Sequence, residues 1–247
     1  MKIKLFIIST VWVLTGVFTS GCIVIDLNGC SAMSVKGSGN VISESRQLPE
    51  FSEIRLEGQG KVSLAQGGQS SLEVTTDDNI LPSIKTEVNN GKLIISHEKG
   101  RNLRPTTLNF TITVKNLAGI SIAGSGDIIG NDEFDSARFY ADIAGSGDIA
   151  ININADRLES SISGSGSISL SGSTNSYDTR ITGSGDVDAF EMRAKDASVV
   201  ITGSGNCRIS ASDMLRAKIT GSGDVLYIGH PRISETITGS GKVKDRN

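Results

Sequence analysis

A polar or charged residue follows each of seven glycine-serine-glycine triplets, and in the first six copies its side chain carries oxygen and is a candidate cation ligand. In chain order they are Asp127, Asp148, Ser167, Asp186, Asn206, Asp224 and Lys242. Calcium binds about six to eight oxygen atoms, and only Asp127 and Asp148 are acids in neighbouring copies, so this pair is the candidate metal site. The alternative is turn capping, because Asp, Asn and Ser side chains bind nearby backbone amides.

Catalytic chemistry has few candidate residues. The two histidines are His97 in SHEKG and His230 in GHPRI, both expected in exposed turns. Hydrolysis needs an oriented histidine or clustered carboxylates, and the acids here are spread along turns. We therefore assign no catalytic residue and no cofactor, and keep an enzyme acting on polysaccharide as an alternative.

The N-terminus predicts covalent lipidation. Lys2 and Lys4 precede the apolar run LFIISTVWVLTGVF (5–18), which is shorter than the roughly 20 residues of a membrane-spanning helix and favours a secretory signal. TSGC (19–22) resembles a lipobox, so we expect a signal peptide over 1–21, lipidation of Cys22 and a linker over 22–34. Cys30 in LNGC, or an ordinary cleavage nearby, are the alternatives. Ile23 after the cysteine favours the outer membrane of the cell envelope.

The amino-acid composition disfavours several classes of binding partner. Cleavage before Cys22 removes Lys2 and Lys4 but no acid, so 24 basic residues become 22 against 27 acidic ones and the net charge changes from −3 to −5. This balance disfavours nucleic acid as a partner. Aromatic residues make up 4% of the chain, which argues against a stacking platform for sugars or bases.

The triplets recur at a nearly fixed interval. Their first glycines are spaced by 21, 19, 19, 20, 18 and 18 residues. Such a period predicts a stacked repeat, and the glycine, serine and β-branched residues favour a β-solenoid with about 19 residues per coil. The triplets expected to form its corners include Gly124-Ser125-Gly126, Gly145-Ser146-Gly147, Gly183-Ser184-Gly185, Gly203-Ser204-Gly205 and Gly221-Ser222-Gly223.

Aliphatic residues flank every triplet and predict two core columns. The first column is Ile122, Ile143, Ile162, Ile181, Ile201, Ile219 and Ile237, and the second is Ile128, Ile149, Ile168, Val187, Cys207, Val225 and Val243. Cys207 should therefore face inward as a small hydrophobe, with Asn206 and Arg208 outward. The row after the first column should face out; its members Thr182, Thr202, Thr220 and Thr238 leave ice binding as an alternative.

The triplet itself is interpreted as architecture. Glycine adopts backbone angles that other residues avoid, which suits a tight corner. The serine hydroxyls are expected to hydrogen-bond to one another along the row. A phosphate-binding loop is disfavoured, because such a loop needs a helix start behind it.

Residues 35–117 contain similar turns and alternating runs, but they lack the regular spacing of the triplets. VKGSGNV (35–41) and LEGQGKV (56–62) carry triplet-like turns, and Asn89-Asn90-Gly91 between two alternating runs predicts a β-hairpin. We expect an all-β capping section over 35–117 on a solenoid over 118–247. The charged segment KVKDRN (242–247) is expected to disfavour end-to-end stacking.

The order of these motifs adds a resemblance. VKGSGNV and LPEFSEIRLEGQGKVSLAQG, then DDNILPSIKTEVNNGKLIIS, then PTTLNFTITVKNLAGISIAGSGDI is similar to the bacterial family named "putative auto-transporter adhesin, head GIN domain", over about residues 35–240. The resemblance implies an exported, all-β protein with a right-handed parallel β-helix, and it supplies no catalytic residues. The sequence thus predicts a lipid-anchored, non-catalytic envelope protein with an adhesive or structural role, whose partner is a glycan or a surface protein.

Overall fold

The computed structural model describes residues 33–247 and is built of strands, with one three-residue 3-10 turn, η1 (Leu81–Ser83). Strands account for 74% of it, which confirms the all-β prediction. The signal segment, Cys22 and Cys30 lie outside the described residues.

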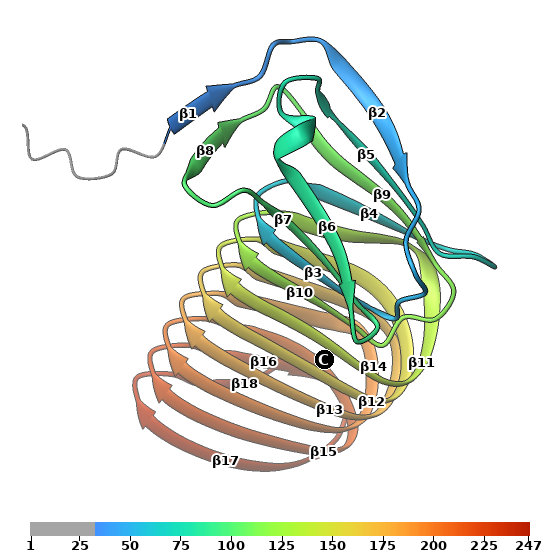
Figure 1. Cartoon of the computed structure of the whole chain (residues 1–247). Helices are drawn as coiled ribbons and strands as arrows, with labels where there is room; N and C mark the ends of the chain where they lie inside the picture. The colour runs from blue at the N-terminus through green and yellow to red at the C-terminus, as the bar shows by residue number, and fades with distance from the viewer. Residues whose placement is uncertain (1–32) are drawn as a thin grey trace, which may run out of the picture. The chain divides into compact units, whose positions relative to one another are not determined.

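Most of the chain forms a stack of parallel coils (Figure 1). Each full coil is one long, curved strand that runs from one triplet to the next and pairs in parallel with the coils before and after it. The register places each opening glycine directly beside the next, from Gly124 through Gly145 to Gly239. This confirms the predicted β-solenoid. Its strands are β10 (Gly119–Gly124), β11 (Asp127–Gly145), β12 (Asp148–Gly164), β13 (Ser167–Gly183), β14 (Asp186–Gly203), β15 (Cys207–Gly221), β16 (Val225–Ile228), β17 (Arg232–Gly239) and β18 (Val243–Asp245).

Both aliphatic columns lie in the core. In the first column every member from Ile122 to Ile219 is at most 2% exposed, while Ile237 on the last coil is 36% exposed. In the second column Cys207 is fully buried between Val187 and Val225, and Asn206 and Arg208 are exposed, as predicted. Burial raises the pKa of the Cys207 thiol, so it stays protonated.

Local bulges explain why the coil length varies between 18 and 21 residues. The register shifts between Ile129 and Glu133 in β11, between Ser169 and Gly172 where β13 meets β14, and between Ala189 and Arg193 where β14 meets β15. These three shifts fall in the same part of each coil, shortly after the triplet, and one more lies further along, between Ala194 and Asp196 where β14 meets β15. Extra residues are therefore absorbed there, and the flanking columns stay aligned.

The triplets form corners that only glycine fits. The opening glycines have φ between +121° and +143°, a region that side chains strain to adopt. A Cβ on Gly145 would lie 2.0 Å from the carbonyl oxygen of Gly124, and one on Gly147 would lie 2.1 Å from that of Gly126. Both glycines of the triplet are thus required by the close approach of successive backbones.

The predicted ladder of serine hydroxyls is wrong. The triplet serines are exposed, and within residues 33–247 their hydroxyls do not bond to one another. Instead, each serine N–H donates to the opening glycine carbonyl of the preceding coil at 2.8–2.9 Å, as Ser146 does to Gly124. The backbone alone satisfies the corner, because the glycines bring it close enough.

A further coil lies ahead of the periodic repeat. Strands β3 (Glu53–Gly58) and β4 (Lys61–Gln66) pair in parallel with β10 and β11, and Gly58 aligns with Gly124. The turn Gly58-Gln59-Gly60 is therefore a true corner of the stack. Gln59 takes the serine position, and its side chain donates to the carbonyl of Leu103 at 2.8 Å.

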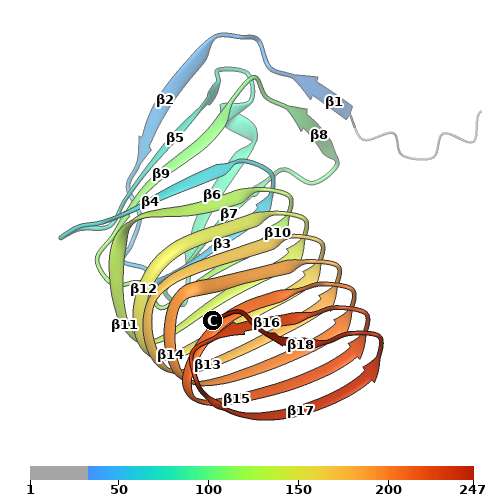
Figure 2. The same cartoon turned by 180° about the vertical axis from the view of Figure 1, so that it is seen from behind.

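Residues 67–118 leave the stack and close its N-terminal end (Figure 2). The Asn-Gly hairpin is confirmed: β6 and β7 pair antiparallel around Asn90 and Gly91, both with positive φ. β7 continues the sheet beyond β3, and β9 continues it beyond β4. Together with residues 33–46, this segment forms the head. Its strands are β1 (Met33–Lys36), β2 (Val41–Arg46), β5 (Ser71–Asp77), β6 (Ile84–Asn89), β7 (Lys92–His97), β8 (Arg101–Arg104) and β9 (Leu108–Val114).

The first glycine-serine-glycine sequence, residues 37–39, is not a coil corner. It joins β1, which pairs with β8, to β2, which pairs antiparallel with β5. Buried Asp77 accepts hydrogen bonds from the N–H groups of Gly39 and Thr106, both at 2.7 Å. Burial alone would raise the pKa of Asp77, but these bonds outweigh it and hold that pKa below its usual value.

The corner geometry predicts opposite outcomes for two adjacent substitutions. In Gly183→Ala the new Cβ would lie 2.3 Å from the carbonyl oxygen of Gly164 at a φ of +121°, so we expect a loss of at least about 2 kcal/mol in the free energy of unfolding. Ser184→Ala should change it by less than about 0.5 kcal/mol, because this side chain is exposed. Urea unfolding of both variants measures this, and equal losses would contradict the corner model.

The second column predicts the behaviour of Cys207. A bulky thiol reagent should label it slowly in the native protein and quickly only after unfolding. Cys207→Val should be tolerated, whereas Cys207→Asp should lower the free energy of unfolding by several kcal/mol, on the order of 3 or more, because it buries an unpaired charge. Arg208→Asp on the outer face is the matched control and should cost much less. Rapid labelling of the folded chain would show that the register is wrong.

Candidate functional site

The polar residues that follow the triplets connect successive coils. The Asp186 carboxylate accepts from the N–H of Asn206 at 2.9 Å, the Asn206 side-chain oxygen accepts from the N–H of Asp224 at 3.1 Å, and Asp224 accepts from the N–H of Lys242 at 2.9 Å. Asp148 does the same for Ser167 at 3.1 Å. This arrangement favours the turn-capping interpretation, with the amide supplied by the next coil.

The calcium interpretation gains no further ligand. Asp127 and Asp148 lie opposite each other in the register of β11 and β12. Within residues 33–247 no group of three or more His, Cys, Asp or Glu is placed to hold a metal ion. Since calcium needs many more oxygens than one aspartate pair supplies, calcium binding stays a prediction.

The two histidines lie at opposite ends of the stack. His230 is exposed after β16, as expected. His97 is different: it is the last residue of β7, is half-buried, and packs beside Gly58, so its assignment to a solvated turn is wrong. The structure therefore does not bring the histidines together.

A groove of about 1140 Å³ follows the bend that each coil makes midway between two triplets. We call it the corner groove. It extends along the solenoid axis from β11 to the residues after β16. Small residues from successive coils lie along its middle, between two rows of more exposed positions. These middle residues are Ser136, Ala155, Thr174, Ala194, Ala211 and Gly229.

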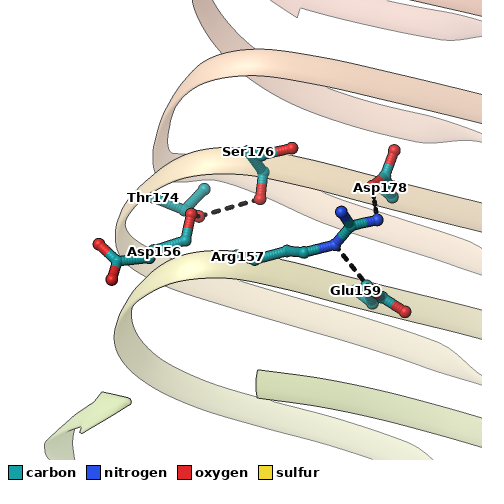
Figure 3. Close-up of polar contacts among 6 residues, drawn as sticks. All are labelled: Asp156, Arg157, Glu159, Thr174, Ser176 and Asp178. Carbon is teal, nitrogen blue, oxygen red and sulfur yellow. Dashed lines mark hydrogen bonds and ion pairs between the residues drawn. The ribbon is translucent and has the colours of Figure 1, made fainter. Parts of the chain in front are cut away.

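Amides and hydroxyls link the coils along both sides of the groove. On one side Asn154 donates to Asp135 at 3.2 Å, and Ser173 donates to Asn154 at 2.8 Å. On the other side Asn175 donates to Asp156 at 3.2 Å. In Figure 3 the Thr174 hydroxyl, which donates to the Ser176 carbonyl at 3.0 Å, lies at the bend beside Asp156. The same kinds of polar group thus recur along the groove at the coil spacing, about 4.8 Å.

The basic residues of the corner groove have no ionic partner. Arg193 and Lys195 flank Ala194 on β14 and are exposed. Neither belongs to an ion pair among the residues that the structure describes. In a chain with an excess of acids, this part of the groove is locally cationic.

A second groove, of about 950 Å³, lies on the adjoining face, and most of its charged side chains are already paired within the described residues, with Arg180 as an exception. Arg157 bridges Glu159 at 2.8 Å on its own coil and Asp178 at 2.9 Å on the next, and Asp156 points away from this cluster (Figure 3). Glu53 accepts from Tyr140 at 2.6 Å and pairs with Lys92 at 2.9 Å. Burial opposes ionisation of Glu53, but these bonds hold its pKa below its usual value. The corner groove is therefore the better candidate for binding a charged ligand.

Sequence reasoning missed the corner groove. Its signal is a third column of small residues midway between the triplets, but the bulges shift that column by several positions from coil to coil. The exposed threonine row, by contrast, lies where the register predicts, and ice binding by it stays a prediction. No helix within residues 33–247 is long and apolar enough to cross a membrane.

Comparison with known proteins places this geometry in a family. The model of the family described as "putative auto-transporter adhesin, head GIN domain" matches residues 50–231. The chain belongs to this family. The match includes the coil β3–β4, most of the head and nearly all of the solenoid, and it confirms the resemblance inferred from the motifs. None of the curated proteins compared with the chain matches it.

Solved structures with the same fold come from Parabacteroides and Bacteroides species. A "putative lipid binding protein" from Parabacteroides distasonis is 28% identical, with a TM-score of 0.75 over 87% of this chain and 100% of that one. A "putative adhesin" from Bacteroides fragilis is 25% identical, with a TM-score of 0.80 over 86% of this chain and 100% of that one. Another so named from P. distasonis is 27% identical, with a TM-score of 0.72 over 86% and 100%. The adhesin names indicate cell-surface proteins, and none of the three names describes an enzyme.

Proposed function

We propose that this protein is a lipid-anchored, non-catalytic component of the cell envelope that binds a polar, chain-like ligand along the corner groove. The ligand is a glycan or an extended segment of a surface protein. The observation that carries the proposal is a groove that runs along the solenoid axis and contains cations without an ionic partner in the described chain.

The repeat suits a ligand that is itself a chain. Side-chain amides and hydroxyls recur along the groove from Asn154 to Ser212, so an extended ligand parallel to the axis meets similar groups at every coil. Each contact is weak, but contacts made by one tethered chain add strongly. The groove has no aromatic lining, which favours hydrogen bonding over stacking.

The charges along the groove favour one orientation of the bound ligand. Asp135 and Asp156 lie toward the head end of the groove, on β11 and β12, and Arg193 and Lys195 lie further along it, on β14. An anionic group, such as a sugar carboxylate or an acidic side chain, fits beside the two cations. The mature chain is acidic overall, so such a ligand is attracted locally and repelled elsewhere.

The use of the groove acids supports a non-catalytic role. Asp135 and Asp156 each accept a hydrogen bond from an asparagine amide of the following coil. These carboxylates thus link successive coils. The adhesin names of the related structures support the same assignment.

Charge reversal in the groove tests the binding function. We expect Arg193→Glu together with Lys195→Glu to weaken binding of the 32–247 unit to its glycan or cell-surface target by about tenfold or more, because two attractive pairs become repulsive. Lys218→Glu, an exposed change on another face, should bind like the parent. Glycan arrays and whole-cell binding supply the measurement, and reducing-end release checks for hydrolysis. Equal binding by both variants would contradict the groove, and released sugar would contradict a non-catalytic role.

Processing at Cys22 tests the anchor. Cys22→Ala should leave the protein without lipid and with its signal uncut, because the modified cysteine is the expected first residue of the mature chain. Metabolic labelling with a fatty acid and the electrophoretic mobility of the product report both changes. Cys30→Ala is the matched control and should be processed normally. A Cys22→Ala protein that is still lipidated would move the anchor to Cys30.

A further inference from the structure

The last coil, made of β17 and β18, presents an uncovered edge. Every residue of β17 is exposed, although its side chains alternate in the same register as those of β15. Ile233 and Ile237 continue the inward columns of Leu215 and Ile219, yet they are 43% and 36% exposed. Within the structure no further strand pairs with β17 or β18 on their outer side. Such an edge is a template for adding another strand.

Two core columns change to acid on this coil and nowhere else. The column that ends at Glu235 is otherwise buried and small or aliphatic: Ile54, Ile120, Ala141, Ser160, Thr179, Val199 and Ala217. The column that ends at Asp245 contains Ala189, Ile209 and Tyr227. Both acids thus occupy positions that face the core in every earlier coil.

The register alone places these acids in the inward columns, and the pKa of Tyr227 agrees with this placement. That pKa is raised first by burial, then by Asp245, and also by the charge of Glu235. Asp245 also accepts hydrogen bonds from the backbone N–H and the side-chain amide of Asn247, at 2.9 and 2.7 Å. A layer added here would take both of them out of water, which is costly for unpaired charges.

The geometry of β17 makes a second copy of this chain the relevant partner. Two copies meeting tail to tail would pair β17 with β17 in antiparallel fashion. To keep inward side chains on one face, the two residue numbers of each pair must sum to an even value. Two even registers give nearly full overlap of β17 (Arg232–Gly239) with its copy. The one that matches isoleucine with isoleucine places Ile233 opposite Ile237 of the copy and Glu235 opposite Glu235, whereas the other would place Glu235 opposite Ile237. The strand is therefore self-complementary except for one directly opposed pair of like charges.

We propose that Glu235 and Asp245 form a stop that prevents a second copy of the chain from stacking tail to tail on the end of the solenoid. The inward-facing acid leaves the backbone edge and the isoleucines competent to pair. What it removes is a dry, uncharged core between the two ends. This inference is independent of the groove, because it concerns a different surface of the molecule.

Removing the central charge tests the stop. The 32–247 unit forms a compact unit by itself, and we expect it to be monomeric by light scattering. Glu235→Val should double the measured mass at the same concentration, because an Ile-Val-Ile face then meets its own copy. Ser234→Val is the matched control: it adds a similar apolar side chain on the outer side of the same strand and should remain monomeric. A monomeric Glu235→Val protein with native circular dichroism, or a dimeric parent, would overturn the proposal.

A charge swap distinguishes this specific stop from non-specific association. Glu235→Lys should be monomeric alone, because lysine then opposes lysine. An equimolar mixture of Glu235→Lys with the parent should form a heterodimer, because lysine faces glutamate. The mixture also keeps the test valid if the valine variant does not fold. Two separate monomers in the mixture would mean that this edge does not meet itself in the proposed register.

Discussion

The close approach of one backbone corner to the next is the constraint on which the structure depends. A Cβ at the opening glycine of a triplet would meet the previous carbonyl oxygen at 2.0–2.3 Å along the regular repeat. Because both flanking glycines lack that atom, each serine N–H reaches the glycine carbonyl of the coil before it. This contact fixes the register of one coil on the next. The alignment of the aliphatic columns, and hence a dry and narrow core, follows from that register.

The fixed corner also determines where the coils are free to differ. Insertions are absorbed as bulges in the segment after the triplet, between Ile129 and Glu133 in β11 and between Ala189 and Arg193 in β14. Beyond the bulges the register is restored, so the middle column returns to alignment from Ala155 to Ala211. The corner groove is built on this restored column. Its exposed flanking residues are not needed for packing, which leaves them available for a ligand.

The sequence pattern predicted the features that depend on residues close together in the chain. The period predicted the solenoid, and the alternation around each triplet placed Cys207 in the core and the threonine row outside. The coil β3–β4 escaped prediction because residues 67–118 separate it from β10, its neighbour in space. The turn at residues 37–39 has the triplet sequence without its role, since Asp77 and not a neighbouring coil holds it. The serine hydroxyl ladder failed because the backbone already satisfies the corner. The groove depends on bulge positions, which only the register reveals.

A solenoid whose coils stabilise one another has no intrinsic length, because each added layer buries further apolar surface and pairs a further edge. Its two ends therefore need separate solutions. At the head, antiparallel strands turn the sheet away from the stacking direction, with β6 on β7 and β5 and β2 beyond β9. At the other end the fold is unchanged and the chemistry of two columns changes, so that Glu235 and Asp245 occupy core positions. Covering a sheet edge with a head takes many residues, whereas placing a charge in a core column takes one residue per strand. The same repeat that makes the coils equivalent thus lets single side chains distinguish one coil from the others, inside at Glu235 and Asp245 and outside along the corner groove.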